Sequence, residues 1–234
     1  MIAVILAAGE GRRLGKLTES VPKPLLRIGG RTILEHNVAL CKAHGFDRLF
    51  INLHHLPEAI RAHIRDGAKW GVSVTYRYEE TLLGTSGAVK SFEPQLGSEP
   101  FLVLYGDNRV EYDLGAFMRR HVATAADMSI AVFRLGDVRH SGVATLDAED
   151  RIVAFVEKPA DKPEGGWVNM GVYAMNPALL RGLPAGFSDF GKDVIPRLVR
   201  EGRRVLAVRM DRKVGAVDTP ELYRQSVGPE GGLP

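Results

Sequence analysis

Cysteine, long basic blocks and long apolar runs are all scarce in this sequence. Cys41 is its only cysteine, which excludes an internal disulfide and fits a reducing compartment. No long block of Lys and Arg residues occurs, and the formal net charge of +3 is too small to predict a nucleic-acid partner. The apolar run nearest the N-terminus, residues 2–8, is far too short to span a bilayer. No basic region precedes this run, as a signal peptide would require. We therefore expect a cytoplasmic protein that binds neither membranes nor nucleic acids.

The composition is otherwise that of a globular protein. Apolar residues make up 45% of the 234 residues, so the chain can bury a sizeable core. The 31 basic residues slightly outnumber the 28 acidic ones, and this mild positive bias suits phosphorylated ligands. The sequence leaves open whether the protein forms a homo-oligomer.

Strand and helix patterns alternate along the first half of the chain. Residues 2–7, 48–53, 72–78 and 101–105 have the apolar, β-branched character of strands. Between them, residues 32–44 and 57–65 have helical periodicity, the first with a capping box formed by Thr32 and Glu35. This order predicts an α/β fold with a mostly parallel or mixed central sheet and helices on both faces. Ligands bind such sheets beyond the carboxyl ends of the strands.

The second half of the chain is mixed. We expect strands at residues 129–135, 143–147, 152–156, 168–175 and 205–210, and helices at 190–201 and 220–226. Because no linker or internal repeat is seen, residues 1–226 are predicted to form one domain. The tail, residues 227–234, is rich in Gly and Pro and is expected to be flexible.

A glycine-rich segment, Leu6-Ala-Ala-Gly-Glu-Gly-Arg-Arg-Leu-Gly15, follows the first predicted strand. Glycines let backbone amides approach phosphate oxygens, and arginine adds a planar fork that matches phosphate. A dinucleotide-binding loop would need a third glycine where Leu14 stands and an acidic residue at the end of the second strand. A P-loop would need Gly-Lys followed by Ser or Thr, which is missing. Farther on, two prolines in Pro22-Lys-Pro-Leu25 stiffen the backbone around Lys23.

Together these motifs resemble the signature of the sugar-1-phosphate nucleotidyltransferases, including guanylyltransferases for mannose and manno-heptose 1-phosphates and uridylyltransferases for N-acetylmuramate 1-phosphate. Further matching segments follow in the same order: Leu83-Gly-Thr-Ser-Gly-Ala88, Gly106-Asp-Asn108, Phe155-Val-Glu-Lys-Pro159, Val168-Asn-Met-Gly-Val-Tyr173 and Thr219-Pro-Glu-Leu-Tyr223. The resemblance implies a Rossmann-like, GT-A-like fold. It assigns residues 1–110 to a nucleotide-binding half and residues 111–226 to a sugar-phosphate-binding half.

The resemblance also implies a reaction. A sugar-phosphate oxygen attacks the α-phosphorus of a nucleoside triphosphate and releases pyrophosphate, so the protein must position two anions and neutralise their charge. The catalytic residues it implies are Arg13, Lys23, Asp107 and Lys158. The nucleotide-binding residues it implies are Ala7, Gly9, Gly11, Arg12, Glu80, Gly84 and Thr85, with Glu79 as an alternative to Glu80. The sugar-binding residues it implies are Asn108, Gly142, Glu157, Asn169 and Gly171.

The cofactor that the resemblance implies is Mg²⁺. Asp107 ends a buried strand, where a carboxylate is costly without a cation, although a turn aspartate before Asn108 is the alternative interpretation. The second ligand is where this sequence departs from many relatives. In an ungapped alignment on Thr219-Pro220, the usual aspartate position falls on Ala216. The segment around Asp218 resembles cytidylyltransferases for acidic sugars, so Asp218 is predicted to be the second ligand.

Base and sugar specificity are weakly marked. Leu83-Gly-Thr-Ser-Gly and residues 190–197 favour guanylyl transfer to a manno-configured hexose or heptose 1-phosphate, which would place the enzyme in nucleotide-sugar synthesis for cell-envelope polysaccharides. Residues 51–56 instead favour N-acetylmuramate-1-phosphate uridylyl transfer. Two other classes stay open: an inactive nucleotide-sugar sensor, because of Ala216, and a dinucleotide-dependent oxidoreductase, against which the missing third glycine argues.

Overall fold

The computed structural model describes residues 1–159, 165–210, 215–217 and 219–227. It forms two compact units. Unit 1 contains Met1–Leu82, Leu104–Leu114 and the described residues from 215 onward. Unit 2 contains Leu83–Val103 and the described residues of 115–210. The fold is α/β with both parallel and antiparallel strand pairs, as the sequence predicts.

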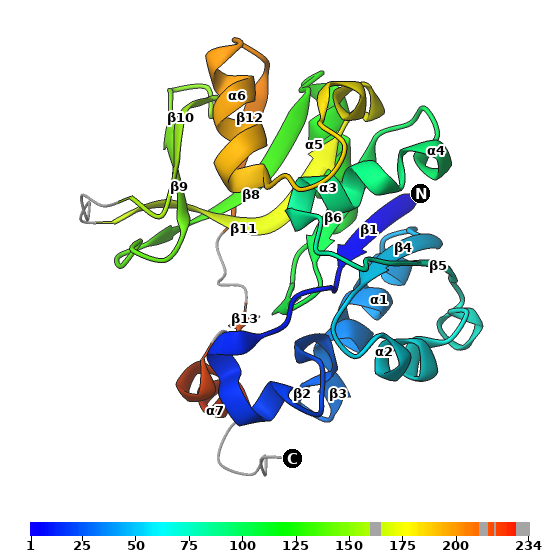
Figure 1. The fold of residues 1–234 in the computed structure, drawn as a ribbon. Helices are drawn as coiled ribbons and strands as arrows, with labels where there is room; N and C mark the ends of the chain where they lie inside the picture. The colour runs from blue at the N-terminus through cyan, green and yellow to red at the C-terminus, as the bar shows by residue number, and fades with distance from the viewer. Residues whose placement is uncertain (160–164, 211–214, 218, 228–234) are drawn as a thin grey trace. The chain divides into compact units, whose positions relative to one another are not determined.

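Unit 1 is built on three parallel strands. β1 (Ile2–Leu6) pairs with β4 (Arg48–Leu53), and β4 pairs with β5 (Ser73–Tyr78), so β4 lies in the middle of this group (Figure 1). Its α-helices are α1 (Ile33–Ala43), α2 (Pro57–Ile64) and α7 (Pro220–Val227). Its shorter elements are the 3-10 turns η1 (Arg12–Thr18), η2 (Lys23–Leu25) and η3 (Ala68–Trp70), and the strands β2 (Arg27–Ile28), β3 (Arg31–Thr32), β7 (Asn108–Arg109) and β13 (Gly215–Ala216).

Local signals account for the helices of unit 1. Thr32 caps α1: its hydroxyl accepts from the Glu35 backbone N–H at 3.1 Å, and the Glu35 carboxylate accepts from the Thr32 N–H at 2.8 Å. This reciprocal pair confirms the predicted capping box. Cys41 lies fully buried on α1, where burial raises the pKa of its thiol to about 12. The thiol is therefore a small core group and stays protonated at neutral pH.

Unit 2 is mostly antiparallel. β8 (Met128–Leu135) and β9 (Gly142–Leu146) each pair antiparallel with β11 (Gly166–Met175). β10 (Ile152–Glu157) pairs antiparallel with β9, and β12 (Val205–Arg209) pairs parallel with β8. The helices of unit 2 are α3 (Gly84–Ser91), α4 (Glu93–Leu96), α5 (Leu114–Ala123), α6 (Ile195–Arg200) and the 3-10 turn η4 (Pro177–Gly182). The strand β6 (Phe101–Tyr105) is shared: its residues up to Val103 belong to unit 2, and its last two belong to unit 1.

Two predicted segments differ in detail. The helix expected at residues 190–201 begins as a π-helix, η5 (Phe190–Val194), in which the Val194 N–H bonds to the Asp189 carbonyl five residues back at 3.1 Å. Lys23, whose flanking prolines were expected to stiffen the backbone without secondary structure, begins the η2 turn, because the Leu26 N–H donates to the Lys23 carbonyl at 3.0 Å.

In the described part of the chain, no helix combines the length and the apolar character that crossing a bilayer requires.

Candidate active site

The glycine-rich segment leaves β1 from a fixed point. The Ala7 N–H donates to Oδ1 of Asn52 at 2.8 Å, and Nδ2 of Asn52 donates to the Glu79 carboxylate at 2.8 Å. Asn52 belongs to β4 and Glu79 follows β5, so the ends of all three parallel strands meet in this chain of hydrogen bonds. All three residues are at most 4% exposed. Hydrogen bonds in such a dry setting hold the first turn of the segment firmly.

Gly11 is the residue that lets the segment fold back on itself. Its φ is +65°, in the left-handed region that favours glycine. A Cβ at this position would lie 2.9 Å from Cγ2 of Thr18 and 3.3 Å from Cβ of Lys23. The Thr18 hydroxyl bonds to the Gly11 and Gly15 carbonyls at 3.1 and 3.2 Å. The glycine therefore brings the predicted nucleotide-binding segment into direct contact with Lys23.

Lys23 and Asp107, predicted to share a site, are in contact. Nζ of Lys23 lies 2.7 Å from Oδ2 of Asp107, although the two residues are 84 positions apart in the sequence. The Lys23 side chain is 5% exposed and the Asp107 side chain is 37% exposed. An almost buried ammonium group thus meets a carboxylate that solvent or a ligand can still reach.

The segment that carries Asp107 is fixed by two close approaches. The Gly106 N–H donates to the Leu6 carbonyl at 2.8 Å, and a Cβ on Gly106 would lie 2.8 Å from the same oxygen. Beyond Asp107, the buried amide of Asn37 donates to the Asn108 carbonyl at 2.9 Å and accepts from the Val110 N–H at 3.4 Å. Asp107 therefore follows directly from a point where the end of β6 touches the end of β1.

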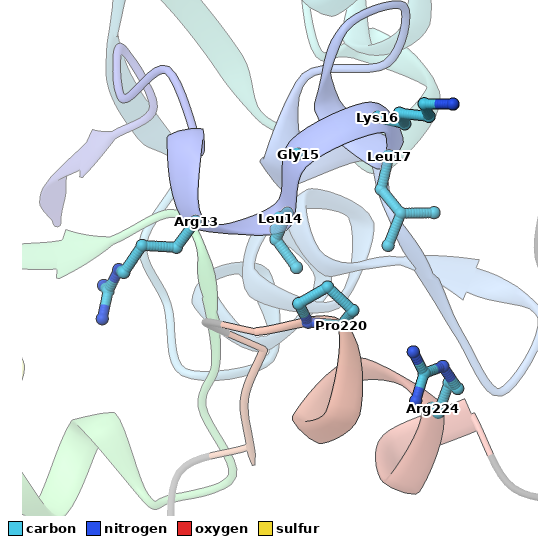
Figure 2. Close-up of a pocket in the computed structure, with 7 residues that line it drawn as sticks. All are labelled: Arg13, Leu14, Gly15, Lys16, Leu17, Pro220 and Arg224. Carbon is cyan, nitrogen blue, oxygen red and sulfur yellow. The ribbon is translucent and has the colours of Figure 1, made fainter.

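The two arginines of the glycine-rich segment differ in their surroundings. Arg12 is exposed and forms an ion pair with Glu10, its neighbour in the same segment. Arg13 lines a pocket of about 360 Å³ with Lys16, Arg224 and the apolar residues Leu14, Leu17 and Pro220, and in Figure 2 the Arg13 and Lys16 side chains extend away from Pro220. Leu14 also belongs to a buried cluster with Val217 and Tyr223, so the C-terminal segment supports this turn. Three of the residues that line the pocket are basic, and their charge favours an anion near it.

Asp107 fits a divalent cation, because Mg²⁺ in proteins is often held by one or two carboxylates together with substrate phosphates. β13 pairs with β7 so that Ala216 lies opposite Asn108, which brings the C-terminal segment beside the residue that follows Asp107. The predicted second ligand, Asp218, lies outside the described residues. Among the residues described, no group of three or more His, Cys, Asp and Glu side chains forms a metal site on its own.

The predicted residues Gly84 and Thr85 lie in unit 2, in the first turn of α3. The Thr85 hydroxyl donates to the Asp189 carboxylate at 3.1 Å and accepts from the Phe190 N–H at 2.9 Å. Gly84 has a φ of +71°, and a Cβ there would lie 2.5 Å from the Ser188 carbonyl oxygen. The predicted base-reading segment is therefore packed against residues 188–190.

Glu157 ends β10 opposite Gly142. A Cβ at Gly142 would lie 2.6 Å from Oε2 of Glu157, and a Cβ at Gly191 would lie 2.4 Å from it. No described residue donates a hydrogen bond to this carboxylate, and burial raises its pKa while Lys158 opposes the shift. Lys158 is exposed and has a φ of +51°, a strained conformation for a residue with a side chain. Strain of this kind is concentrated at functional sites.

Asn169 and Gly171 shape an irregular stretch of β11. The register shifts between Asn169 and Tyr173, and Gly171 has a φ of +72°. The Asn169 amide donates to the Tyr173 hydroxyl at 2.7 Å and accepts from the Gly171 N–H at 2.9 Å. The side chain of Asn169 is thus held in one orientation by its own strand.

Sequence reasoning missed Asn37 and Asn52, whose buried amides hold the two segments of unit 1. The only signal for each was a polar residue within an otherwise apolar pattern. Of the two neighbouring glutamates, Glu79 is buried and belongs to the hydrogen-bond chain, whereas Glu80, the predicted nucleotide contact, is exposed. The structure brings together Ala7, Gly11, Lys23 and Asp107 in unit 1.

Two known proteins that are similar to this chain are named as sugar-1-phosphate nucleotidyltransferases. A UTP–glucose-1-phosphate uridylyltransferase from Synechocystis sp. is 33% identical over 227 residues, covering 90% of this chain and 58% of that protein. A mannose-1-phosphate guanylyltransferase from Mycobacterium tuberculosis is 32% identical over 201 residues, covering 86% of this chain and 56% of that protein. The chain thus spans little more than half the length of these relatives.

Solved structures share the fold. HddC from Yersinia pseudotuberculosis superposes with a TM-score of 0.82 at 24% identity, covering 97% of both chains, and has also been solved complexed with GMP-PN. A putative glucose-1-phosphate thymidylyltransferase from Bacillus anthracis gives a TM-score of 0.88 at 20% identity, covering 97% of this chain and 94% of that one. The nucleotidyl transferase family model matches residues 2–219, and the chain therefore belongs to the nucleotidyl transferase family.

Proposed function

We propose that this protein transfers a nucleoside monophosphate from a nucleoside triphosphate to a sugar 1-phosphate and releases pyrophosphate. The observation that carries the proposal is the contact between Lys23 and Asp107, at 2.7 Å, beside the glycine-rich segment. This arrangement offers fixed positive charge, a reachable carboxylate and backbone amides in one unit. Those are the groups that phosphoryl-type transfer needs, because catalysis there is mostly positioning and charge stabilisation.

In the proposed reaction an oxygen of the sugar phosphate attacks the α-phosphorus of the nucleotide. The bond from that phosphorus to the oxygen that bridges it to the β-phosphate breaks, and pyrophosphate leaves with the bonding electrons. Lys23 would face the negative charge that grows on the transferring phosphate, and Arg13 would bind the leaving phosphates. Both side chains carry their charge before the substrates arrive, so little reorganisation is needed at the moment of reaction.

Asp107 would hold the divalent cation, which we propose to be Mg²⁺. When bound, such a cation would neutralise charge on the substrate phosphates. Lys23 contacts one oxygen of Asp107 and thereby keeps the carboxylate in place. Asp218 stays the predicted second ligand.

Unit 2 would supply the sugar-phosphate contacts. Lys158 would bind the phosphate, and its strained backbone supports a functional role. The Glu157 carboxylate receives no hydrogen bond from the described residues, so it can accept one from a sugar hydroxyl. Gly142 leaves room beside that carboxylate, since a Cβ there would clash with it.

For the substrates, we propose GTP and a manno-configured hexose or heptose 1-phosphate. The segment Leu83-Gly-Thr-Ser-Gly supports guanylyl transfer, as does the similarity to a mannose-1-phosphate guanylyltransferase. A uridylyltransferase is the second candidate, because a UTP–glucose-1-phosphate uridylyltransferase is similar to the same extent. N-acetylmuramate 1-phosphate is the other acceptor that the sequence favours for UTP. An inactive nucleotide-sugar sensor would be the outcome if Ala216 marks a lost metal ligand.

A pyrophosphate-release assay tests the proposal. Purified protein is mixed with Mg²⁺, each of the four common ribonucleoside triphosphates and dTTP, and each of four acceptors: the 1-phosphates of mannose, manno-heptose, glucose and N-acetylmuramate. We expect release with GTP and mannose or manno-heptose 1-phosphate, and mass spectrometry of the product should give the GDP-sugar. Release with UTP alone would replace the guanylyl assignment by the uridylyl one. No release with any pair, together with measurable nucleotide-sugar binding, would favour the sensor.

A further inference from the structure

A short segment of unit 2, Ser188–Gly191, lies between residues predicted to bind different substrates. We call it the 188–191 strap. On one side it contacts the beginning of α3, the predicted base-reading segment. On the other side it contacts the residues predicted to bind the sugar. The sequence had marked residues 190–197 only as a helical segment that favours a manno-configured sugar, and it had given residues 188 and 189 no role.

The contacts with α3 are numerous and specific. The Ser188 carbonyl accepts from the N–H groups of Ser86 and Gly87 at 3.0 and 3.1 Å, and the hydroxyls of Ser86 and Ser188 bond at 2.8 Å. Oδ1 of Asp189 accepts from both the N–H and the hydroxyl of Thr85, at 3.2 and 3.1 Å. A carboxylate that accepts at the first turn of a helix binds it more strongly than a neutral group would.

The contacts with the sugar side start one residue later. The Phe190 ring packs against the ring of Tyr173, with centroids 4.8 Å apart. The Tyr173 hydroxyl accepts from the Asn169 amide at 2.7 Å, so Phe190 supports the side chain that orients Asn169. The next residue, Gly191, backs the Glu157 carboxylate so closely that a Cβ would lie 2.4 Å from Oε2.

Thr85 therefore reaches the sugar side in two steps. Its hydroxyl accepts from the Phe190 N–H at 2.9 Å while donating to Asp189. A shift of Thr85 would move the Phe190 backbone, and with it the ring on Tyr173 and the Cα of Gly191 beneath Glu157. Close-packed groups of this kind transmit displacement, because they have no free volume to absorb it.

We propose that Asp189 is a positioning residue that couples the two substrates: by fixing Thr85 to the strap, it makes occupancy of the nucleotide segment change the affinity for the sugar phosphate. The proposal rests on the proposed function. Asp189 itself need touch neither substrate. If Asp189 had only a structural role, substituting it would lower stability to the same extent with and without nucleotide. If it couples the substrates, substituting it changes how much the nucleotide alters the affinity for the sugar phosphate.

The experiment measures the dissociation constant of the sugar 1-phosphate twice, alone and with a saturating α,β-methylene analogue of the nucleoside triphosphate. The analogue cannot transfer its nucleotide, so binding is read without turnover. For the wild-type protein we expect the analogue to tighten sugar-phosphate binding about fivefold or more, within the usual range of coupling between sites. For Asp189→Ala we expect the two dissociation constants to agree within about twofold.

Conservative variants separate position from charge. Asp189→Asn keeps an oxygen that can accept both Thr85 bonds, so it should retain most of the coupling. Thr85→Val removes the hydroxyl that joins Asp189 to Phe190, and should lose the coupling as Asp189→Ala does. The double variant should lose little more than either single one, because both remove the same link.

Asp127→Ala is the matched control. Asp127 also joins two segments of unit 2, through bonds from the Arg203 guanidinium at 2.6 Å and the Arg204 N–H at 2.9 Å, away from the strap contacts. It should be destabilised but keep the wild-type coupling. If Asp189→Ala does not fold, Thr85→Val decides. If Asp189→Ala or Thr85→Val turns over normally and keeps the wild-type coupling, the inference is overturned and the proposed function stands. The same holds if the wild-type protein turns over normally but shows no coupling. Failure of wild type to bind or convert any pair refutes the proposed function and this inference with it.

Discussion

Replacing Lys23 by methionine should remove most of the proposed activity and leave the fold intact. Methionine keeps a flexible apolar stem of similar length in a position that is 5% exposed, beside Gly11 and Thr18. What it removes is one fixed positive charge, 2.7 Å from the Asp107 carboxylate. The variant therefore tests charge rather than packing.

The substitution should affect activity far more than stability. Deleting one preorganised donor to developing charge costs about 10²- to 10³-fold in kcat, or about 2.7–4 kcal/mol. The cost in stability should be far smaller, about 1 kcal/mol or less, because Asp107 is 37% exposed and water can hydrate the carboxylate left behind. Removing a nearly buried ammonium group also relieves its desolvation cost.

The assay compares kcat/KM for pyrophosphate release with urea unfolding of the same preparations. Lys69→Met is the control, because Lys69 is an exposed lysine over the Trp70 ring and should change neither quantity appreciably. Lys23→Arg should also fail, since the larger planar group has to replace an ammonium group whose side chain is only 5% exposed. A Lys23→Met enzyme within about threefold of wild type would refute the charge role that we assign to this residue.

Three further outcomes are expected. Asp107→Asn should lower kcat at least about 100-fold and raise the Mg²⁺ concentration needed for half-maximal rate, while Asp66→Asn, at a turn that caps the Ala68 N–H, should behave as wild type; equal Mg²⁺ curves would exclude Asp107 as a ligand. Gly11→Ala should lower the free energy of unfolding by about 1–3 kcal/mol, because an alanine at this φ is strained and meets Thr18, whereas Gly9→Ala, with open space around it, should cost less; the reverse order in chemical denaturation would contradict this. Burial lowers the pKa of His121 below 6.5, so the unfolded chain binds this proton at higher pH than the folded chain. The free energy of unfolding should therefore be highest above about pH 6.5 and fall as the pH drops below that value. His121→Gln should flatten this pH dependence in urea unfolding.

Much of unit 1 was predictable because its signals are local. The capping box of α1 and the continuous apolar strands β1 and β4 need only neighbouring residues to be recognised. The meeting of Lys23 and Asp107 was also foreseeable, since segments that leave the carboxyl ends of neighbouring strands lie at one edge of a sheet. Here a motif and a topological rule point to the same place.

The remaining features depend on long-range contacts that leave no periodic trace. Asn37 and Asn52 interrupt apolar patterns, yet the amide of each bonds a backbone group in a distant part of the chain. The strap follows from the same limitation: Asp189 and Thr85 are 104 positions apart, so neither marks the other in the sequence. The choice between Ala216 and Asp218 as the position of the second metal ligand also stays with the sequence, because Asp218 is outside the described residues.

The most direct test of the central claim follows the phosphorus atoms. The protein is incubated with Mg²⁺, the sugar 1-phosphate selected by the substrate panel, and the nucleoside triphosphate labelled with ³²P at either the α or the γ position. We expect the α label in a nucleotide-sugar and the γ label in pyrophosphate, in equal amounts, with both products lost in Lys23→Met. An α label recovered only as free nucleotide, or a γ label released as inorganic phosphate, would contradict nucleotidyl transfer at the site of Lys23 and Asp107.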